Sequence, residues 1–203
     1  MQAVRGSYCG RPRRSIRLLC LSYLIGSIFL TLVGHAAPVV FAAGAVWYVK
    51  PTGSDSNPCQ TPTTPCKTIN GAFSKAISSG DTVSIAAGTY TENIIIPPGL
   101  TSVTLLGAGA ALTILDGNNA GSVVMASSGT ALSVSGMTIQ HGKAAAGGGI
   151  SATTVTISNS IFTNNSASFA GGGIVALGTA QSATAPSPTM LLHNLVAALA
   201  PTF

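Results

Sequence analysis

The stretch Gly147-Gly148-Gly149-Ile150 returns 24 residues later as Gly171-Gly172-Gly173-Ile174. The residues before the two copies match as well, because Leu132-Ser133-Val134-Ser135-Gly136 aligns with Val155-Thr156-Ile157-Ser158-Asn159 at a spacing of 23. A period in the low twenties, built from short alternating apolar runs and glycine turns, is typical of the coils of a parallel β-solenoid. The repeat therefore predicts a scaffold whose function depends on the side chains that it displays.

The N-terminus carries most of the formal net charge of +5, since all five arginines lie before Leu18. An apolar run from Leu18 to Val33 and small residues around Ala42 follow, which predicts a secretory signal peptide over residues 1–42 with cleavage after Ala42. The alternative is a signal anchor, but the run of about sixteen residues is shorter than the roughly twenty that span a bilayer. We expect a secreted or cell-surface protein that contacts the membrane only through an uncleaved signal peptide.

The rest of the chain is nearly free of charge. Residues 43–203 hold four lysines and four acidic residues, so their formal charges cancel. Nucleic acid is therefore not an expected partner, because such partners require a basic surface. We expect a surface of Ser, Thr, Asn and Gly, whose side chains satisfy one another from coil to coil.

Cys59 and Cys66 are the only cysteines after residue 42. Two cysteines so close together in an exported chain predict a disulfide, which would stabilise the fold by roughly 2.5 kcal/mol. A metal site is the alternative, but no histidine lies nearby and a spacing of seven is not a zinc spacing.

A single helix is predicted, over Thr68–Ser79, where Ile69, Phe73, Ala76 and Ile77 share one face. Together with the disulfide loop it would form an N-terminal cap over residues 43–80. From Asp81 onward short strands alternate with Gly or Asn turns, which predicts four to five coils over residues 81–176. One strand is expected in the cap, at 47–49. The strands expected in the coils are 83–85, 94–96, 103–106, 113–115, 123–125, 132–134, 137–139, 155–157 and 160–162.

Two groups of motifs resemble known families. The segments Tyr48-Val49, Cys66-Lys67-Thr68-Ile69, Gly80-Asp81-Thr82-Val83 and Ala87 to Asn93 are similar to the cap and first coil of secreted β-helix proteins of the pectin-lyase-like superfamily. The Gly-Gly-Gly-Ile motifs, with Phe162-Thr163-Asn164-Asn165, resemble the GGAI and FxxN repeats of chlamydial polymorphic outer-membrane proteins.

The resemblance covers about residues 47–175 and implies an all-β fold, a right-handed single-stranded parallel β-helix with an N-terminal capping helix. It also implies a bacterial surface protein. It implies no particular activity, because this superfamily includes enzymes, adhesins and passive scaffolds. The structural repeat residues are then Gly147, Gly148, Gly149, Ile150, Phe162, Asn165, Gly171, Gly172, Gly173 and Ile174.

The pattern changes after Ala176. In residues 177–203 neither the regular glycine turns nor the strand alternation persists, which predicts an irregular tail. The tail is either a C-terminal cap built on Met190, Leu191, Leu195 and Val196 or the end of a truncated or frame-shifted gene, and the loss of the repeat favours truncation.

No catalytic, cofactor-binding or metal-binding residue is predicted. Turn roles account for Asp55, Asp81 and Asp116, and Glu92 in the Glu-Asn pair resembles a scaffold residue of pectinesterases. His141 has no carboxylate or nucleophile in its own coil and is interpreted as a turn residue.

We therefore expect a non-catalytic surface or extracellular protein, adhesin-like or carbohydrate-contacting, with a polysaccharide or a host cell surface as partner. The alternatives are a polysaccharide-active enzyme of the pectate lyase or pectinesterase type, and a non-functional gene fragment.

Overall fold

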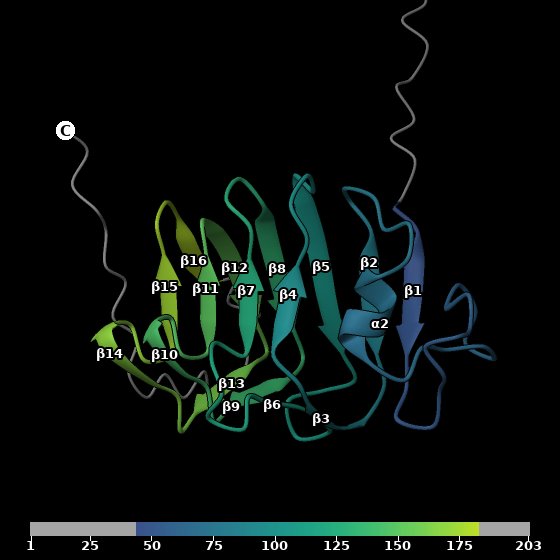
Figure 1. Cartoon of the computed structure of the whole chain (residues 1–203), viewed down its shortest axis with the longest axis horizontal. Helices are drawn as coiled ribbons and strands as arrows, with labels where there is room; N and C mark the ends of the chain where they lie inside the picture. Colours follow the sequence, from purple (N-terminus) through teal and green to yellow (C-terminus); the bar gives the residue numbers. More distant parts are fainter. Residues whose placement is uncertain (1–43, 183–203) are drawn as a thin grey trace, which may run out of the picture. The chain divides into compact units, whose positions relative to one another are not determined.

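The described part of the chain, residues 44–182 of the computed structural model, is a parallel β-solenoid of about four turns (Figure 1). Each coil adds one strand to each of three parallel sheets, which we name A, B and C in the order in which the chain visits them. The last two coils add one strand each to a fourth, two-stranded sheet D. The predicted parallel β-solenoid is confirmed.

Sheet A contains six strands: β1 (Val46–Val49), β2 (Thr82–Ile85), β5 (Ser102–Gly107), β8 (Ala131–Ser135), β12 (Thr154–Ser158) and β16 (Ala180–Ser182). Sheet B contains β3 (Gly88–Thr91), β6 (Thr113–Asp116), β9 (Thr138–Gln140) and β13 (Ile161–Thr163). Sheet C contains β4 (Ile94–Ile96), β7 (Val124–Ala126), β11 (Ile150–Ala152) and β15 (Ile174–Ala176). Sheet D pairs β10 (Lys143–Ala146) with β14 (Ser166–Ala170).

The glycine repeat marks one coil, as the sequence predicts. Ile150 is stacked on Ile174 in sheet C, and the N–H groups of Gly149 and Ile150 donate to carbonyls 23 residues further on, at 3.0 and 2.9 Å. The second alignment is also confirmed, because Leu132 pairs with Val155. The first glycine of each copy has a positive φ, 63° at Gly147 and 57° at Gly171, which a residue with a Cβ rarely adopts.

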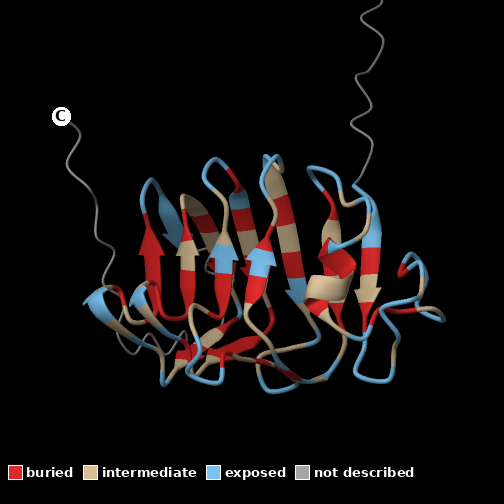
Figure 2. Cartoon of the chain, in the orientation of Figure 1, coloured by how far each residue is buried: buried red, intermediate tan, exposed pale blue. Residues whose placement is uncertain are grey.

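The core is the interior of the solenoid, filled by columns of stacked apolar side chains. Inward positions of sheets A, B and C are almost fully buried, and most outward positions are half-buried or exposed (Figure 2). Burying such a side chain contributes about 1.5–3 kcal/mol, so each coil is stabilised mainly by its neighbours. The innermost columns are Val83–Leu105–Val134–Ile157, Tyr90–Leu115–Ile139–Phe162 and Ile94–Val124–Ile150–Ile174.

A disulfide joins Cys59 and Cys66, as predicted, and both residues are buried. The loop that it closes runs along β1, where the Tyr48 N–H donates to the Cys59 carbonyl at 2.7 Å and the Cys66 N–H donates to the Tyr48 carbonyl at 2.8 Å. These bonds satisfy the backbone groups of β1 on the side away from β2.

The predicted helix is shorter than expected. Helix α2 spans only Ile69–Phe73, with Thr68 as its N-cap, so the prediction of a helix to Ser79 is wrong. Ala76, expected on the apolar face, is exposed. The competing interaction is local: the N–H of Ser78 donates to the Asp81 carboxylate at 2.9 Å, which draws this serine-rich segment out of the helix.

Helix α2 lies beside β4 at the N-terminal end of sheet C (Figure 1). The Asn70 side chain donates to the Asn93 carbonyl at 2.9 Å and accepts from the Ile95 N–H at 3.1 Å. An amide side chain thus pairs with β4 where the neighbouring coil would have supplied a strand.

The strands that alternate clearly were predicted and are present, with ends that differ by one or two residues. Six strands were not predicted: β3, β10, β11, β14, β15 and β16. Strand β16 falls in the first residues of the expected tail 177–203. The expected signal peptide, residues 1–42, and residues 183–203 lie outside the described residues. Within residues 44–182 no helix is long and apolar enough to cross a bilayer.

Candidate functional site

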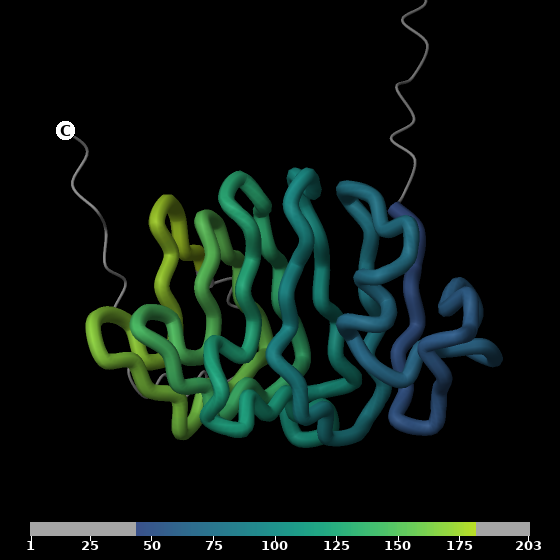
Figure 3. The backbone as a smooth tube through the Cα atoms, viewed as in Figure 1, coloured from purple at the N-terminus to yellow at the C-terminus, as the bar shows by residue number. Residues whose placement is uncertain are grey.

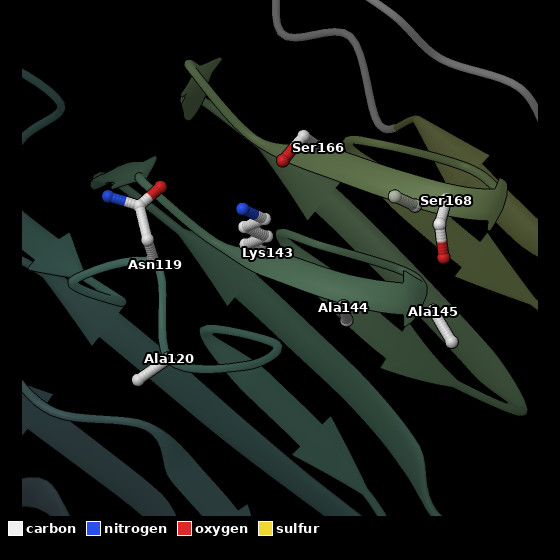
Figure 4. A pocket seen from close by; sticks show the side chains of 8 residues that line it. Asn119, Ala120, Lys143, Ala144, Ala145, Ser166 and Ser168 are labelled. Atoms are coloured by element: carbon white, nitrogen blue, oxygen red, sulfur yellow. The ribbon is translucent and has the colours of Figure 1, made fainter.

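An open groove of about 600 Å³ crosses three coils of the solenoid (Figure 4). Its polar side chains are Asn119 from the turn after β6, Lys143 from β10, and Ser166 and Ser168 from β14. Figure 4 shows the Lys143 amine on the same side as the Asn119 amide and the Ser166 hydroxyl. Amide, ammonium and hydroxyl groups of successive coils therefore line one surface, which we call the polar groove.

The backbone of three coils holds this groove in place. The Asn119 N–H donates to the His141 carbonyl at 2.7 Å, the Lys143 N–H to the Gly121 carbonyl at 2.9 Å, and the Ser166 N–H to the Gly142 carbonyl at 2.8 Å. His141 and Asn164 both have a positive φ, so the chain turns sharply before β10 and again before β14. These two turns lead into sheet D, whose strands β10 and β14 form one wall of the groove.

A second groove of about 380 Å³ separates sheet D from the outer face of sheet C. Ile95 and Met125 lie side by side on this face and are 56% and 47% exposed. Ala144 and Ala145 line both grooves, so β10 separates an apolar surface from a polar one.

All four acidic residues accept hydrogen bonds from the backbone. Asp55 accepts the N–H groups of Lys67 and Thr68, each at 2.9 Å. Glu92 accepts the N–H groups of Ile69 and Asn70, at 2.8 and 3.0 Å, and so binds the first turn of α2. The turn and scaffold roles expected for Asp55 and Glu92 fit these contacts.

Asp81 accepts three hydrogen bonds, from the Ala45 N–H, the Ser78 N–H and the Trp47 indole N–H, at 2.8–2.9 Å. Burial raises the pKa of Asp81, but the three hydrogen bonds stabilise the carboxylate more strongly and hold its pKa below the ordinary value. Asp81 therefore joins β1 to the start of the first coil.

Asp116 differs from the others, because its carboxylate contacts a histidine side chain. Its Oδ2 lies 2.9 Å from His141 Nδ1 and accepts the Gln140 amide N–H at 2.9 Å. Burial raises the pKa of Asp116, but hydrogen bonds from Gln140, His141 and the Asn118 N–H outweigh it, so the pKa is lowered. The His141 side chain is 38% exposed, and its Nε2 faces the Asn164 amide at 3.5 Å.

The sequence places His141 at a turn, and its φ of 52° confirms this. The sequence did not pair it with Asp116, because the carboxylate comes from the preceding coil, 25 residues earlier. A carboxylate about one coil before His141 is the sequence pattern from which the pair could have been predicted. Within the described residues the pair has only amide neighbours in hydrogen-bond contact, and no cluster of three or more His, Cys, Asp or Glu could hold a metal ion.

The other repeat residues have structural contacts. Asn165 Oδ1 accepts the Gly142 N–H and its Nδ2 donates to the Ile139 carbonyl, both at 2.8 Å. Phe162 is buried in the column of sheet B. The Phe-x-x-Asn motif thus places an apolar side chain inside the coil and an amide that fastens the turn.

No family model matches the chain, and no curated protein and no solved structure matches it either.

Proposed function

We propose that this protein is a non-catalytic, exported β-helix protein of the cell surface or extracellular space that contacts carbohydrate through the polar groove. The observation that carries the proposal is the alignment of Asn119, Lys143 and Ser166 on three successive coils (Figure 4). Their amide, ammonium and hydroxyl groups donate and accept the hydrogen bonds that sugar hydroxyls require.

The spacing of the coils supports a chain-like ligand. Neighbouring parallel strands lie roughly 4.8 Å apart, a distance close to the length of one sugar unit in an extended polysaccharide. Consecutive sugars of one chain could therefore meet equivalent positions on consecutive coils. An open groove of about 600 Å³ also suits a polymer that enters and leaves at both ends.

We also propose the handedness and type of the solenoid and a capping role for α2. The solenoid is a right-handed β-helix of the pectin-lyase-like type, and α2 with the Cys59–Cys66 loop closes its N-terminal end. Export rests on the signal-peptide pattern of residues 1–42 and agrees with a disulfide, which persists in oxidising compartments.

The test is binding to a panel of neutral and acidic polysaccharides, measured by titration calorimetry. We expect Lys143→Ala and Asn119→Ala each to weaken the binding of any polysaccharide that the protein retains. Lys50→Ala is the matched control, because Lys50 is also an exposed lysine but lies outside the groove. Binding that survives both groove substitutions would contradict the proposal.

The second candidate is a polysaccharide-active enzyme, and the observation that favours it is the Asp116–His141 pair. An imidazole oriented by a carboxylate is a common general base. Incubation with pectin or polygalacturonate should yield no unsaturated product and no methanol if the protein is not an enzyme. Turnover that Asp116→Asn and His141→Ala abolish would establish the enzyme instead.

A further inference from the structure

On the four inner strands of sheet A, β2, β5, β8 and β12, most outward residues carry hydroxyl groups in register. On its strands the inward residues, such as Val83 and Leu105, are buried, while the residues between them are half-buried and point away from the core. Because the strands are parallel and their registers are continuous, outward residues of successive coils form straight columns.

Three such columns lie side by side. Over these four strands most of their members are Ser or Thr, and the interruptions are Ala131 and Leu106. On the edge strands the columns end at Val46 and Tyr48 of β1 and at Gln181 of β16. The columns are Thr82–Thr104–Ser133–Thr156, Ser84–Leu106–Ser135–Ser158 and Ser102–Ala131–Thr154. We name this surface the hydroxyl face.

The coils that carry the hydroxyl face are stacked one on the next along a nearly straight axis (Figure 3). The hydroxyl of Ser158 donates to that of Ser135 at 2.9 Å, so neighbouring coils already bring these groups to hydrogen-bond distance. The face is therefore a regular array with a fixed spacing.

That spacing is close to a spacing of ordered water. Two water oxygens bound to a common third water at the tetrahedral angle lie about 4.5 Å apart when each hydrogen bond is about 2.75 Å long. Coils lie roughly 4.8 Å apart, so the mismatch over the three steps of the first column totals about 1 Å. Rotation of a hydroxyl can absorb a difference of this size.

The hydroxyl face is also uncharged, which suits contact with ordered water. No strand of sheet A carries a charged side chain. This matters because a charged group orients a shell of water around itself and so disturbs an ordered water layer. The lysines and acidic residues of the described chain lie outside sheet A. A neutral array of hydroxyl and methyl groups is complementary to a neutral lattice of water.

We propose that the hydroxyl face binds the surface of ice. A crystalline polysaccharide also presents ordered hydroxyl groups, but flat sugar surfaces are commonly bound by aromatic rings, and Tyr48 is the only aromatic residue among the outward strand positions of sheet A. This site is separate from the polar groove, whose lining residues come from sheet D and the turn after β6.

The test is partition into ice. Protein recovered after expression of the full chain is held in solution while polycrystalline ice grows slowly, and its concentration is measured in the ice and in the remaining liquid. We expect the wild type to enter the ice and also to slow ice recrystallisation. We expect Thr104→Lys and Thr156→Lys to be excluded to the level of serum albumin, because a long charged side chain prevents flat contact.

The matched control is Thr89→Lys, which places the same substitution on an exposed outward position of sheet B. It should partition into ice like the wild type. Circular dichroism and the thermal midpoint report whether each variant folds. If the lysine variants fail to fold, Thr104→Val and Thr156→Val provide the test, since they remove the hydroxyl and keep the shape.

Exclusion of the wild type from ice would overturn the proposal, as would equal partition of the wild type and the folded sheet A variants. Loss of partition in Thr89→Lys would remove the assignment to sheet A. Retention of the wild type on microcrystalline cellulose, with exclusion from ice, would identify the hydroxyl face as a polysaccharide surface instead.

Discussion

Single carboxylates carry much of the specificity of this fold, because the described chain has so few charges. Asp81 is 3% exposed and accepts hydrogen bonds from two backbone N–H groups and the Trp47 indole. Asp116 instead receives side chains of the next coil. The first therefore fastens the N-terminal segment, whereas the second joins two coils near the polar groove.

Removal of the Asp81 carboxylate should be costly. We expect Asp81→Ala to lower the free energy of unfolding by about 3 kcal/mol, because hydrogen bonds to a charged group are worth roughly 1.5–3 kcal/mol and their donors would be left unpaired. Asp81→Asn should cost less, since it keeps one acceptor. Urea denaturation of the two variants measures the difference, and equal stability of Asp81→Ala and the wild type would contradict the role given to this residue.

The same residues make stability depend on pH. Asp55, Asp81 and Asp116 all have lowered pKa values: burial raises each one, but hydrogen bonds outweigh it. A lowered folded-state pKa contributes stability that is present above the unfolded value, about 3.9, and is lost as the pH falls through the folded value. We expect the urea midpoint to be nearly constant from about pH 5 to 7 and to fall below about pH 4.

Asp81→Asn provides the control for this pH dependence, because one of the three groups can then no longer titrate. Its urea midpoint should fall less steeply in acid than that of the wild type. A midpoint that rises in acid would show that the sign is wrong.

At the scale of the element, close backbone approach explains the glycine motif better than flexibility does. A Cβ on Gly148 would meet the carbonyl oxygens of Ser166 and Gly172, which belong to the next coil. Gly171 is restricted twice, by its positive φ and by the carbonyl oxygen of Ile174. The motif therefore allows the turn between sheets D and C to be stacked at the normal coil separation.

Gly148→Ala should thus destabilise the protein by roughly 3 kcal/mol, the upper part of the usual range for overpacking, because backbone atoms must move. Gly129→Ala is the matched control: Gly129 also lies in a turn, but nothing lies within 4 Å of its Cβ position. Its positive φ alone should cost about 1–2 kcal/mol. Thermal denaturation of both variants tests the order, and a smaller loss for Gly148→Ala would contradict it.

Elements with clear alternation were predictable, and those without it were not. Apolar and polar residues alternate in Val83-Ser84-Ile85 and Val155-Thr156-Ile157, which predicts a strand with one buried face. The segment Lys143–Ala146 consists of Lys and Ala and has no such alternation. Strand β10 exists because β14 pairs with it, so its conformation depends on a partner about one coil away. The helix was predicted too long for the related reason that Asp81 competes for the Ser78 N–H.

At the scale of the molecule, the solenoid has two different ends. At the N-terminal end, β1 pairs with the disulfide loop and β4 with Asn70. At the other end of sheet A the last described strand is β16, which lies on β12 with Val155, Thr156 and Ile157 opposite Ala180, Gln181 and Ser182. The coil pattern thus continues beyond Ala176.

Truncation after Ala176 should therefore cost stability that truncation after Ser182 does not. Removal of β16 exposes the edge of β12, and loss of two or three backbone hydrogen bonds at about 1 kcal/mol each should lower the free energy of unfolding by roughly 2–3 kcal/mol. Differential scanning calorimetry of the two truncated chains measures this. Identical midpoints would mean that β16 adds nothing to the solenoid.

The sequence by itself determined the repeating unit and the parallel solenoid, because alternation and glycine turns are local signals that recur from coil to coil. It also determined the disulfide, because the short spacing of Cys59 and Cys66 is a local signal too. Only the tertiary structure decided which side chains meet. The spacing between stacked residues is 22 for Thr82 and Thr104 but 30 for Ile94 and Val124, so no single period aligns all the coils. The pair of Asp116 with His141, the polar groove and the hydroxyl face depend on these registers, and a register becomes fixed only when one coil packs on the next.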